Sequence, residues 1–111
     1  MKKVFALILP AILTTCAVSE AAVYKGQREF HKQCKKCHDN GQEIAATYKK
    51  KSWNKMMKNK GEGLAEIHLN NEKAKDSWKY FKSSKYKKNA KHLEDFMVEY
   101  AKDSGNVPAC N

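Results

Sequence analysis

The sequence has little of what strands, tight loops and polar catalytic sites are built from. It contains two prolines, and Pro108 is the only one after residue 21. No stretch alternates apolar and polar residues in the manner of a half-buried strand. A glycine-rich phosphate loop and a Ser/His/Asp set are also missing. These absences favour an all-helical protein and give no support to a hydrolase or a nucleotide-binding enzyme.

Long apolar runs are scarce, and the one that exists lies near the N-terminus. Lys2 and Lys3 precede the apolar run 4–13, and Ser19-Glu20-Ala21 has small residues at both positions that a signal peptidase reads. The run is too short for a stable membrane span. We therefore predict a secretory signal peptide over residues 1–21, one periplasmic domain over residues 22–111, and no integral span after cleavage. An alternative is a lipoprotein signal ending at Cys16, although Thr15 is a poor residue just before the cysteine.

Arginine is nearly missing, although the chain is strongly basic, with a net charge of +10. Cleavage of the signal would remove Lys2, Lys3 and Glu20. The mature chain would then have 20 basic and 11 acidic residues in place of 22 and 12, which gives a net charge of about +9. Arg28 is the sole arginine, and lysine suits bidentate phosphate or base contacts less well. With export predicted as well, we expect no nucleic acid partner. The lysines suit steering toward partner proteins with acidic surfaces, or they are only a solvated surface.

Cysteine is limited to four positions, which narrows the chemistry available to it. Cys34 and Cys37 form the only C-x-x-C pair, and the sequence has no H-x-x-x-H, so a complete zinc site has too few ligands at suitable spacing. A thioredoxin-like dithiol would require βαβ sequence around the pair. Cys110 is left over after signal removal, and it suggests an intermolecular disulfide, a tether or an idle thiol.

The C-x-x-C pair is followed at once by His38, which makes Cys34-Lys35-Lys36-Cys37-His38 an attachment signal for a c-type haem. Two thiols three positions apart lie on one face of a helical turn, where they can form thioether bonds to the two vinyl groups of one haem. His38 then lies under the ring, where its imidazole can bind the iron as proximal ligand. The sequence therefore predicts one covalently bound haem c.

Helices are expected throughout the chain after the signal. The apolar spacing predicts helices at about 23–38, from Ser52 as N-cap to about Lys58, at about 72–82, and at about 89–103. Breaks are expected at Asp39-Asn40-Gly41, at Gly61-Glu62-Gly63 and at Ser83-Ser84. Leu64, Ile67 and His68 are expected to face inward together.

The two ends of the mature chain resemble class I cytochromes c. Gly26 and Phe30 precede the haem motif by the steps seen in that family, and Leu93, Phe96, Met97 and Tyr100 are similar to its last helix. The resemblance implies an all-α, cytochrome c-like bundle of three to five helices around the haem. It also implies that Gly26 lets the last helix cross close to the first one. In the middle of the chain, the family's loop methionine has no counterpart between Lys58 and Phe96.

The sixth iron ligand is therefore open among several candidates. His68 is our first choice, because enough chain separates it from His38 to round the haem edge and its neighbours are apolar; its alternative role is a core histidine bonded to a carbonyl. Met57 and Met56 follow His38 much more closely, and a methionine pair beside Trp53 is commonly core packing. The remaining candidates for the sixth position are Met97 and an open or weakly held site, with water or Asn70 as the ligand.

The function expected from these residues is electron transfer rather than catalysis. A small monohaem cytochrome c would pass single electrons between respiratory redox proteins in the periplasm, and it would not be an enzyme. The alternative is a haem protein with an open iron site that binds gases or reacts with peroxide, as an enzyme or a sensor. A third interpretation is a haem-free thiol or metal protein that uses Cys34 and Cys37.

Overall fold

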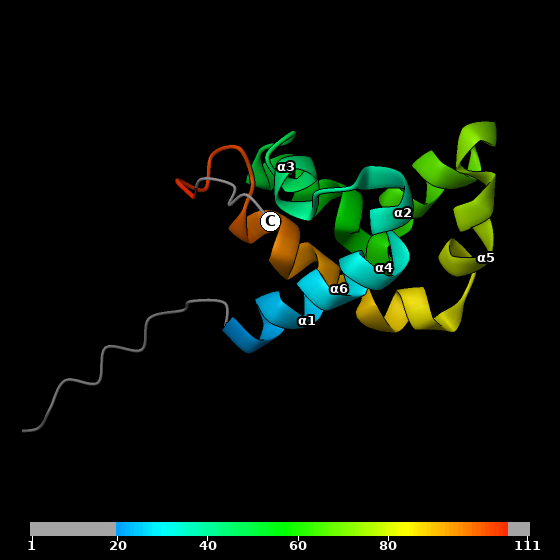
Figure 1. The fold of residues 1–111 in the computed structure, drawn as a ribbon, viewed down its shortest axis with the longest axis horizontal. Coiled ribbons are helices and arrows are strands. Elements are labelled where there is room, and N and C mark those ends of the chain that lie inside the picture. Colours follow the sequence, from blue (N-terminus) through cyan, green and yellow to red (C-terminus); the bar gives the residue numbers. More distant parts are fainter. Residues whose placement is uncertain (1–19, 107–111) are drawn as a thin grey trace, which may run out of the picture.

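The computed structural model describes residues 20–106, and this part of the chain is helical with no strand. The predicted all-α class is confirmed for these residues. The elements, shown in Figure 1, are α1 (Glu20–Gln33), α2 (Lys35–His38), α3 (Gly41–Ala45), α4 (Lys50–Leu69), the 3₁₀ helix η1 (Glu72–Ser77), α5 (Trp78–Phe81) and α6 (Ser84–Glu99). Most of the predicted signal peptide, with Cys16, and the C-terminal Pro108 and Cys110 lie outside the described residues.

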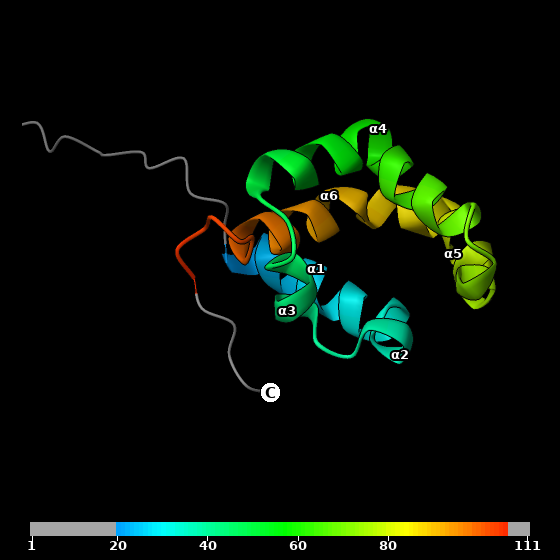
Figure 2. The ribbon, with the colours of Figure 1, turned by 90° about the horizontal axis from the view of Figure 1, so that it is seen from above.

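Helix α6 is the central element, and it lies between α1 on one side and α4 on the other (Figure 2). Its buried face supplies Leu93, Phe96 and Met97 to the core, where Phe30 of α1 and Trp53 of α4 meet it. Burial of such side chains is the main favourable term of folding, at about 1.5–3 kcal/mol each. Within the described residues, none of the helices combines the length and apolar character that a membrane crossing requires.

The crossing of α1 and α6 is made possible by Gly26. A Cβ atom at this position would lie 1.9 Å from the backbone oxygen of His92 and 2.7 Å from Cβ of Phe96. Only a residue without a side chain permits backbones to approach so closely. The expected role of this glycine, close passage of the last helix, is therefore confirmed.

Helix α4 is divided by a kink at residues 58–61. Asn59, Lys60 and Gly61 take φ values of 53°, 59° and 78°, which lie in the left-handed region that L-residues seldom adopt. The buried hydroxyl of Tyr86 donates a hydrogen bond to the Gly61 carbonyl at 2.6 Å and holds the kink against α6. The predicted break in this region is confirmed, although it falls mostly before Gly61.

Several predicted boundaries differ from those observed. The predicted helix 23–38 is interrupted at Cys34, and the predicted helix 72–82 is a 3₁₀ turn followed by one turn of α5. A further short helix, α3, begins after Asn40, whose side chain accepts hydrogen bonds from the backbone N–H groups of Gln42 and Glu43. For these reasons the prediction of three to five helices is too low for the described residues.

Helix α6 begins at Ser84 rather than near residue 89, and it ends at Glu99 rather than near residue 103. Ser83, expected to lie in a loop, is its N-cap: the Ser83 hydroxyl accepts a hydrogen bond from the Tyr86 backbone N–H at 3.2 Å. Tyr86 is 1% exposed, so the first turn of the helix is anchored in the core. At the other end, the N–H of Tyr100 bonds to the Phe96 carbonyl and closes the helix.

Candidate functional site

The C-x-x-C-H motif forms a single tight turn between α1 and α3. The backbone N–H groups of Cys37 and His38 both donate to the Cys34 carbonyl, at 3.1 and 3.0 Å. Asp39 then takes a φ of 63°, which ends α2 directly after the histidine. The turn therefore presents the two thiols and the imidazole from one short stretch of chain.

A cavity of about 430 Å³ opens between this turn and the second half of α4 with η1 and α5. Cys34, Cys37 and His38 line one side of it, and Leu64, Ile67 and His68 line another. The rest of the wall is mostly apolar and includes Trp53, Phe30, Phe81 and Met97. The volume falls within the range of about 300–1,000 Å³ that is typical of cofactor sites. The expectation that Leu64, Ile67 and His68 face inward together is confirmed in part: all three line the cavity and Leu64 and His68 are half-buried, but Ile67 is 53% exposed at its edge.

The imidazoles of His38 and His68 lie next to each other in this space, with their planes nearly perpendicular. Their ring centres lie 6.0 Å apart and their planes are inclined by 82°. The two residues are far apart in the sequence and come from different elements, α2 and α4. The structure thus brings His68, the first choice for the sixth ligand, next to His38.

His68 is held by three contacts that leave one ring nitrogen available. Its Nδ1 donates a hydrogen bond to the Leu64 carbonyl at 2.8 Å. The ring of Phe81 stacks on it with centres 4.2 Å apart and planes inclined by 26°. The indole N–H of Trp78 donates to the His68 backbone carbonyl at 2.7 Å. A hydrogen bond to Nδ1 is the arrangement that orients Nε2 of a histidine for binding a metal.

Burial and neighbouring charges shift the titration of the motif residues. Partial burial lowers the pKa of His38, and the adjacent imidazole of His68 lowers it further because two imidazolium charges would repel. Both effects favour the neutral form that can act as a metal ligand. Burial raises the pKa of the Cys34 thiol to about 12, with smaller contributions from Glu29 and Cys37.

The other candidate ligands lie in less favourable positions. Met56 is half-buried and lines the cavity, whereas Met57 is 4% exposed, packs in the core and is not part of the cavity wall. Met97 lines the cavity from α6 as a core residue. His31 is exposed on α1. His92 is half-buried, and its Nδ1 is buried without a hydrogen-bond partner in the described part of the chain.

A buried polar pair next to the motif has no counterpart among the sequence predictions. Glu29 is 7% exposed and accepts a hydrogen bond from the Tyr80 hydroxyl at 2.7 Å. Burial, followed by the hydrogen bond to Glu29, raises the pKa of Tyr80. The partners are 51 residues apart, so no local pattern in the sequence could have indicated that this glutamate turns inward. The stacking of Phe81 on His68 is likewise invisible in the sequence, where Phe81 is simply an apolar position.

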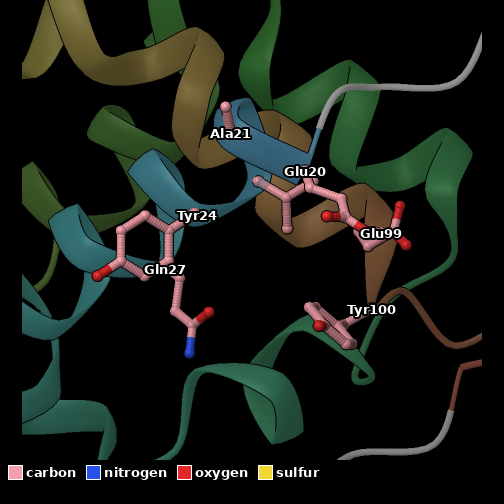
Figure 3. A pocket seen from close by; sticks show the side chains of 7 residues that line it. Glu20, Ala21, Tyr24, Gln27, Glu99 and Tyr100 are labelled. Carbon is pink, nitrogen blue, oxygen red and sulfur yellow. The ribbon is translucent and has the colours of Figure 1, made fainter.

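A second hollow lies between the start of α1 and the end of α6. Figure 3 shows it lined by Tyr24 and Gln27 of α1 and by Glu99 and Tyr100, with Glu20 and Ala21 at its edge. Its volume of about 550 Å³ exceeds that of the first cavity, but it is more open to solvent. Glu20 and Ala21 belong to the segment whose cleavage we predict, so the mature protein would lose part of this rim. The cavity beside the C-x-x-C-H turn is therefore the better candidate.

Comparisons of the chain with protein-family models, with curated proteins and with solved structures find no match.

Proposed function

We propose that this protein is an exported, monohaem c-type cytochrome that carries single electrons and has His38 and His68 as its axial iron ligands. The observation that carries the proposal is that two predicted ligands lie in one cavity. A haem-attachment motif and a distant histidine line the same apolar cavity, with their imidazole centres 6.0 Å apart. Both histidines are predicted as ligands from the sequence, and their proximity in the fold supports this pairing.

The two thiols suit covalent attachment of a haem. Each thiol would add across one vinyl group, with its sulfur bonded to one carbon and its hydrogen to the other, so that attachment consumes no oxidant. Cys34 and Cys37 both line the cavity, as the reaction requires. A domain of about 90 residues has a small hydrophobic core, so such a covalent link would also add stability.

The spacing of the two imidazoles suits one iron between them. An imidazole nitrogen binds a metal at about 2 Å. Two such bonds plus half the width of each ring give a separation close to the 6.0 Å between the ring centres. Among residues 20–106, no three His, Cys, Asp or Glu side chains gather closely enough to hold a metal ion by themselves. A haem needs only axial ligands from the protein, since its macrocycle supplies the other four nitrogens.

The surrounding protein favours electron transfer over catalysis. When bound, the haem iron would gain or lose one electron, and the mostly apolar wall of the cavity would pack against the macrocycle. Histidine at both axial positions gives a lower reduction potential than the histidine–methionine pair of typical class I proteins. The glycine-mediated crossing of α1 and α6 supports the proposed cytochrome c-like arrangement. Acidic redox proteins are the partners that the lysine-rich surface would suit.

The proposal is tested by absorption spectra of protein exported from a host that matures c-type cytochromes. We expect a pyridine haemochrome of the c type, low-spin bands in both oxidation states, and no far-red band from a methionine–iron bond. A far-red band would instead assign the sixth position to a methionine of the cavity wall, Met56 or Met97. A colourless protein would contradict the proposal.

Replacing the sixth ligand separates the electron carrier from the open-site alternative. We expect His68→Ala to give a high-spin ferrous form that binds carbon monoxide rapidly, because His68 is the imidazole that lies next to His38 in the cavity. His31→Ala, an exposed histidine on α1, is the matched control and should retain the low-spin spectrum. Rapid carbon monoxide binding by the unaltered protein would favour a gas-binding or peroxide-reacting haem protein.

A further inference from the structure

We propose that Phe81 is a positioning residue that holds the imidazole of His68 nearly perpendicular to that of His38. The inference rests on the proposed function, because it concerns the two axial ligands of the haem. It goes further by assigning the relative orientation of those ligands to one aromatic side chain in α5.

The contact between Phe81 and His68 is a face-to-face stack. The ring centres lie 4.2 Å apart with an inclination of 26°. Phe81 is 6% exposed, so its ring is enclosed by the core rather than resting on a mobile surface. The χ2 torsion of a histidine is otherwise broad, and a flat neighbour on one face is what selects a single ring plane.

Phe81 is itself fixed by two tyrosines. The rings of Tyr86 and Tyr80 meet it edge-on, at centre distances of 4.8 and 5.5 Å and inclinations of 70° and 62°. Tyr86 is anchored through its hydroxyl to the Gly61 carbonyl, and Tyr80 through its hydroxyl to Glu29. A change in the plane of Phe81 would therefore disturb one buried and one partly buried hydrogen bond, so the stack is a stiff support.

The other two contacts of His68 act on one ring nitrogen and on the backbone. The hydrogen bond from Nδ1 to the Leu64 carbonyl holds one edge of the ring, and the bond from Trp78 holds the backbone. The hydrogen bond at Nδ1 also restricts the ring plane, but a hydrogen bond tolerates a range of angles, so some tilt would remain if the face of the ring were free. Phe81 is therefore the contact that removes the remaining tilt and holds the ring at 82° to His38.

The angle has a spectroscopic consequence that packing alone does not have. Each imidazole plane contains its own iron–nitrogen bond, so the angle between the planes becomes the twist between the two axial ligands. A perpendicular pair interacts almost equally with the two iron d orbitals that mix with the rings and leaves them nearly equal in energy. Low-spin ferric iron then gives an electron paramagnetic resonance spectrum dominated by one large g value at low field. A parallel pair splits the orbitals and gives three resolved g values.

The test compares electron paramagnetic resonance spectra and reduction potentials of haem-loaded variants. We expect the unaltered protein to show the single low-field feature. Phe81→Leu should shift this feature to smaller g and bring out the remaining two, together with a shift in potential. Phe81→Tyr, which retains the stacked ring, should restore the original spectrum. Phe81→Met fills more of the space and provides the same test if Phe81→Leu does not fold.

The matched control is Phe96→Leu, which removes an equal aromatic volume from the core. The Phe96 ring packs on Phe30 and Tyr100 rather than on His68. It should lower stability without moving the low-field feature. Three results would overturn the inference alone: three resolved g values in the unaltered protein, an unchanged spectrum in Phe81→Leu and Phe81→Met, or an equal shift in Phe96→Leu. A negative haemochrome assay on the same sample would instead overturn the proposed function.

Discussion

The two thiols of the motif are three positions apart but lie in different surroundings. Cys34 is partly enclosed beside the buried carboxyl of Glu29, whereas Cys37 is exposed. Burial raises the pKa of the Cys34 thiol from 9.0 to about 12. Because the thiolate is the reactive form, the two residues should not behave alike before a haem is attached.

Alkylation of haem-free protein should modify Cys37 before Cys34. The raised pKa leaves very little Cys34 thiolate at pH 8, so iodoacetamide should label it several-fold more slowly than the exposed Cys37; peptide mapping after a reducing step measures both. Folding favours the protonated Cys34 thiol, so its contribution to stability is complete below pH 9 and is lost between pH 9 and about 12. Equal labelling rates in the folded protein, matching those in urea, would contradict this difference.

Among elements, the crossing of α1 and α6 depends most on a single position. Gly26 leaves no room for a methyl group, because a Cβ atom would lie 1.9 Å from a backbone oxygen that cannot rotate away. The two helices would have to move apart and loosen the contact between Phe30 and Phe96, whose ring centres are 6.0 Å apart.

We therefore expect Gly26→Ala to lower the free energy of unfolding, although alanine is the better helix former. Overpacking typically costs about 1–3 kcal/mol, and a clash with the backbone belongs at the upper end of that range. Urea denaturation followed by circular dichroism measures the loss. Lys25→Ala, at an exposed position in the same turn, is the control and should leave stability almost unchanged. A neutral Gly26→Ala would show that the helices do not cross as described.

Local sequence signals identified the elements better than their boundaries. The motif turn, the break near Gly61 and the presence of a last helix could be predicted because each has its own local pattern. The start of α6 could not be predicted, since serine is common both in loops and at helix caps. Ser83 is a helix cap here because Tyr86, whose N–H it accepts a hydrogen bond from, is buried in the core. Asn59 is a residue type that tolerates left-handed backbone, but Lys60 carries no signal for it, and the kink is stabilised by a hydrogen bond from a residue 25 positions after Gly61.

At the scale of the whole molecule, the surface is strongly basic. All 20 lysine and arginine side chains between residues 20 and 106 are exposed, and the acidic residues are too few to balance them. Lys73 lies at the cavity itself. The positive potential should therefore act on any charged molecule that approaches the proposed haem.

Electron transfer with small inorganic reagents should depend on salt in opposite ways according to their charge. Raising the ionic strength should slow oxidation by an anionic complex and accelerate oxidation by a cationic complex of similar potential, because salt screens attraction and repulsion alike. Stopped-flow rates between about 10 and 500 mM salt would measure both slopes. Two flat slopes would mean that the lysines only solvate the surface and do not steer partners.

The distances that define the candidate site lie beyond the reach of local patterns. The sequence identified His38 from its motif and ranked His68 from its apolar neighbours, but it could not place one ring next to the other across the intervening chain. It also could not separate Met56, which lines the cavity, from Met57, which packs in the core. The difference arises from the rotation of α4 about its axis, which is set by its packing on α6.

The kink in α4 bears on how this protein can change in length during evolution. Between Gly61 and His68 the chain is helical, so one inserted or deleted residue would turn His68 by about 100° and direct its imidazole away from His38. Within residues 58–60 the backbone has already left the helix, so an added residue there could be absorbed as a longer loop without rotating the helical turns that carry His68. Related chains should therefore vary in length before Gly61, while the step from Gly61 to His68 stays constant.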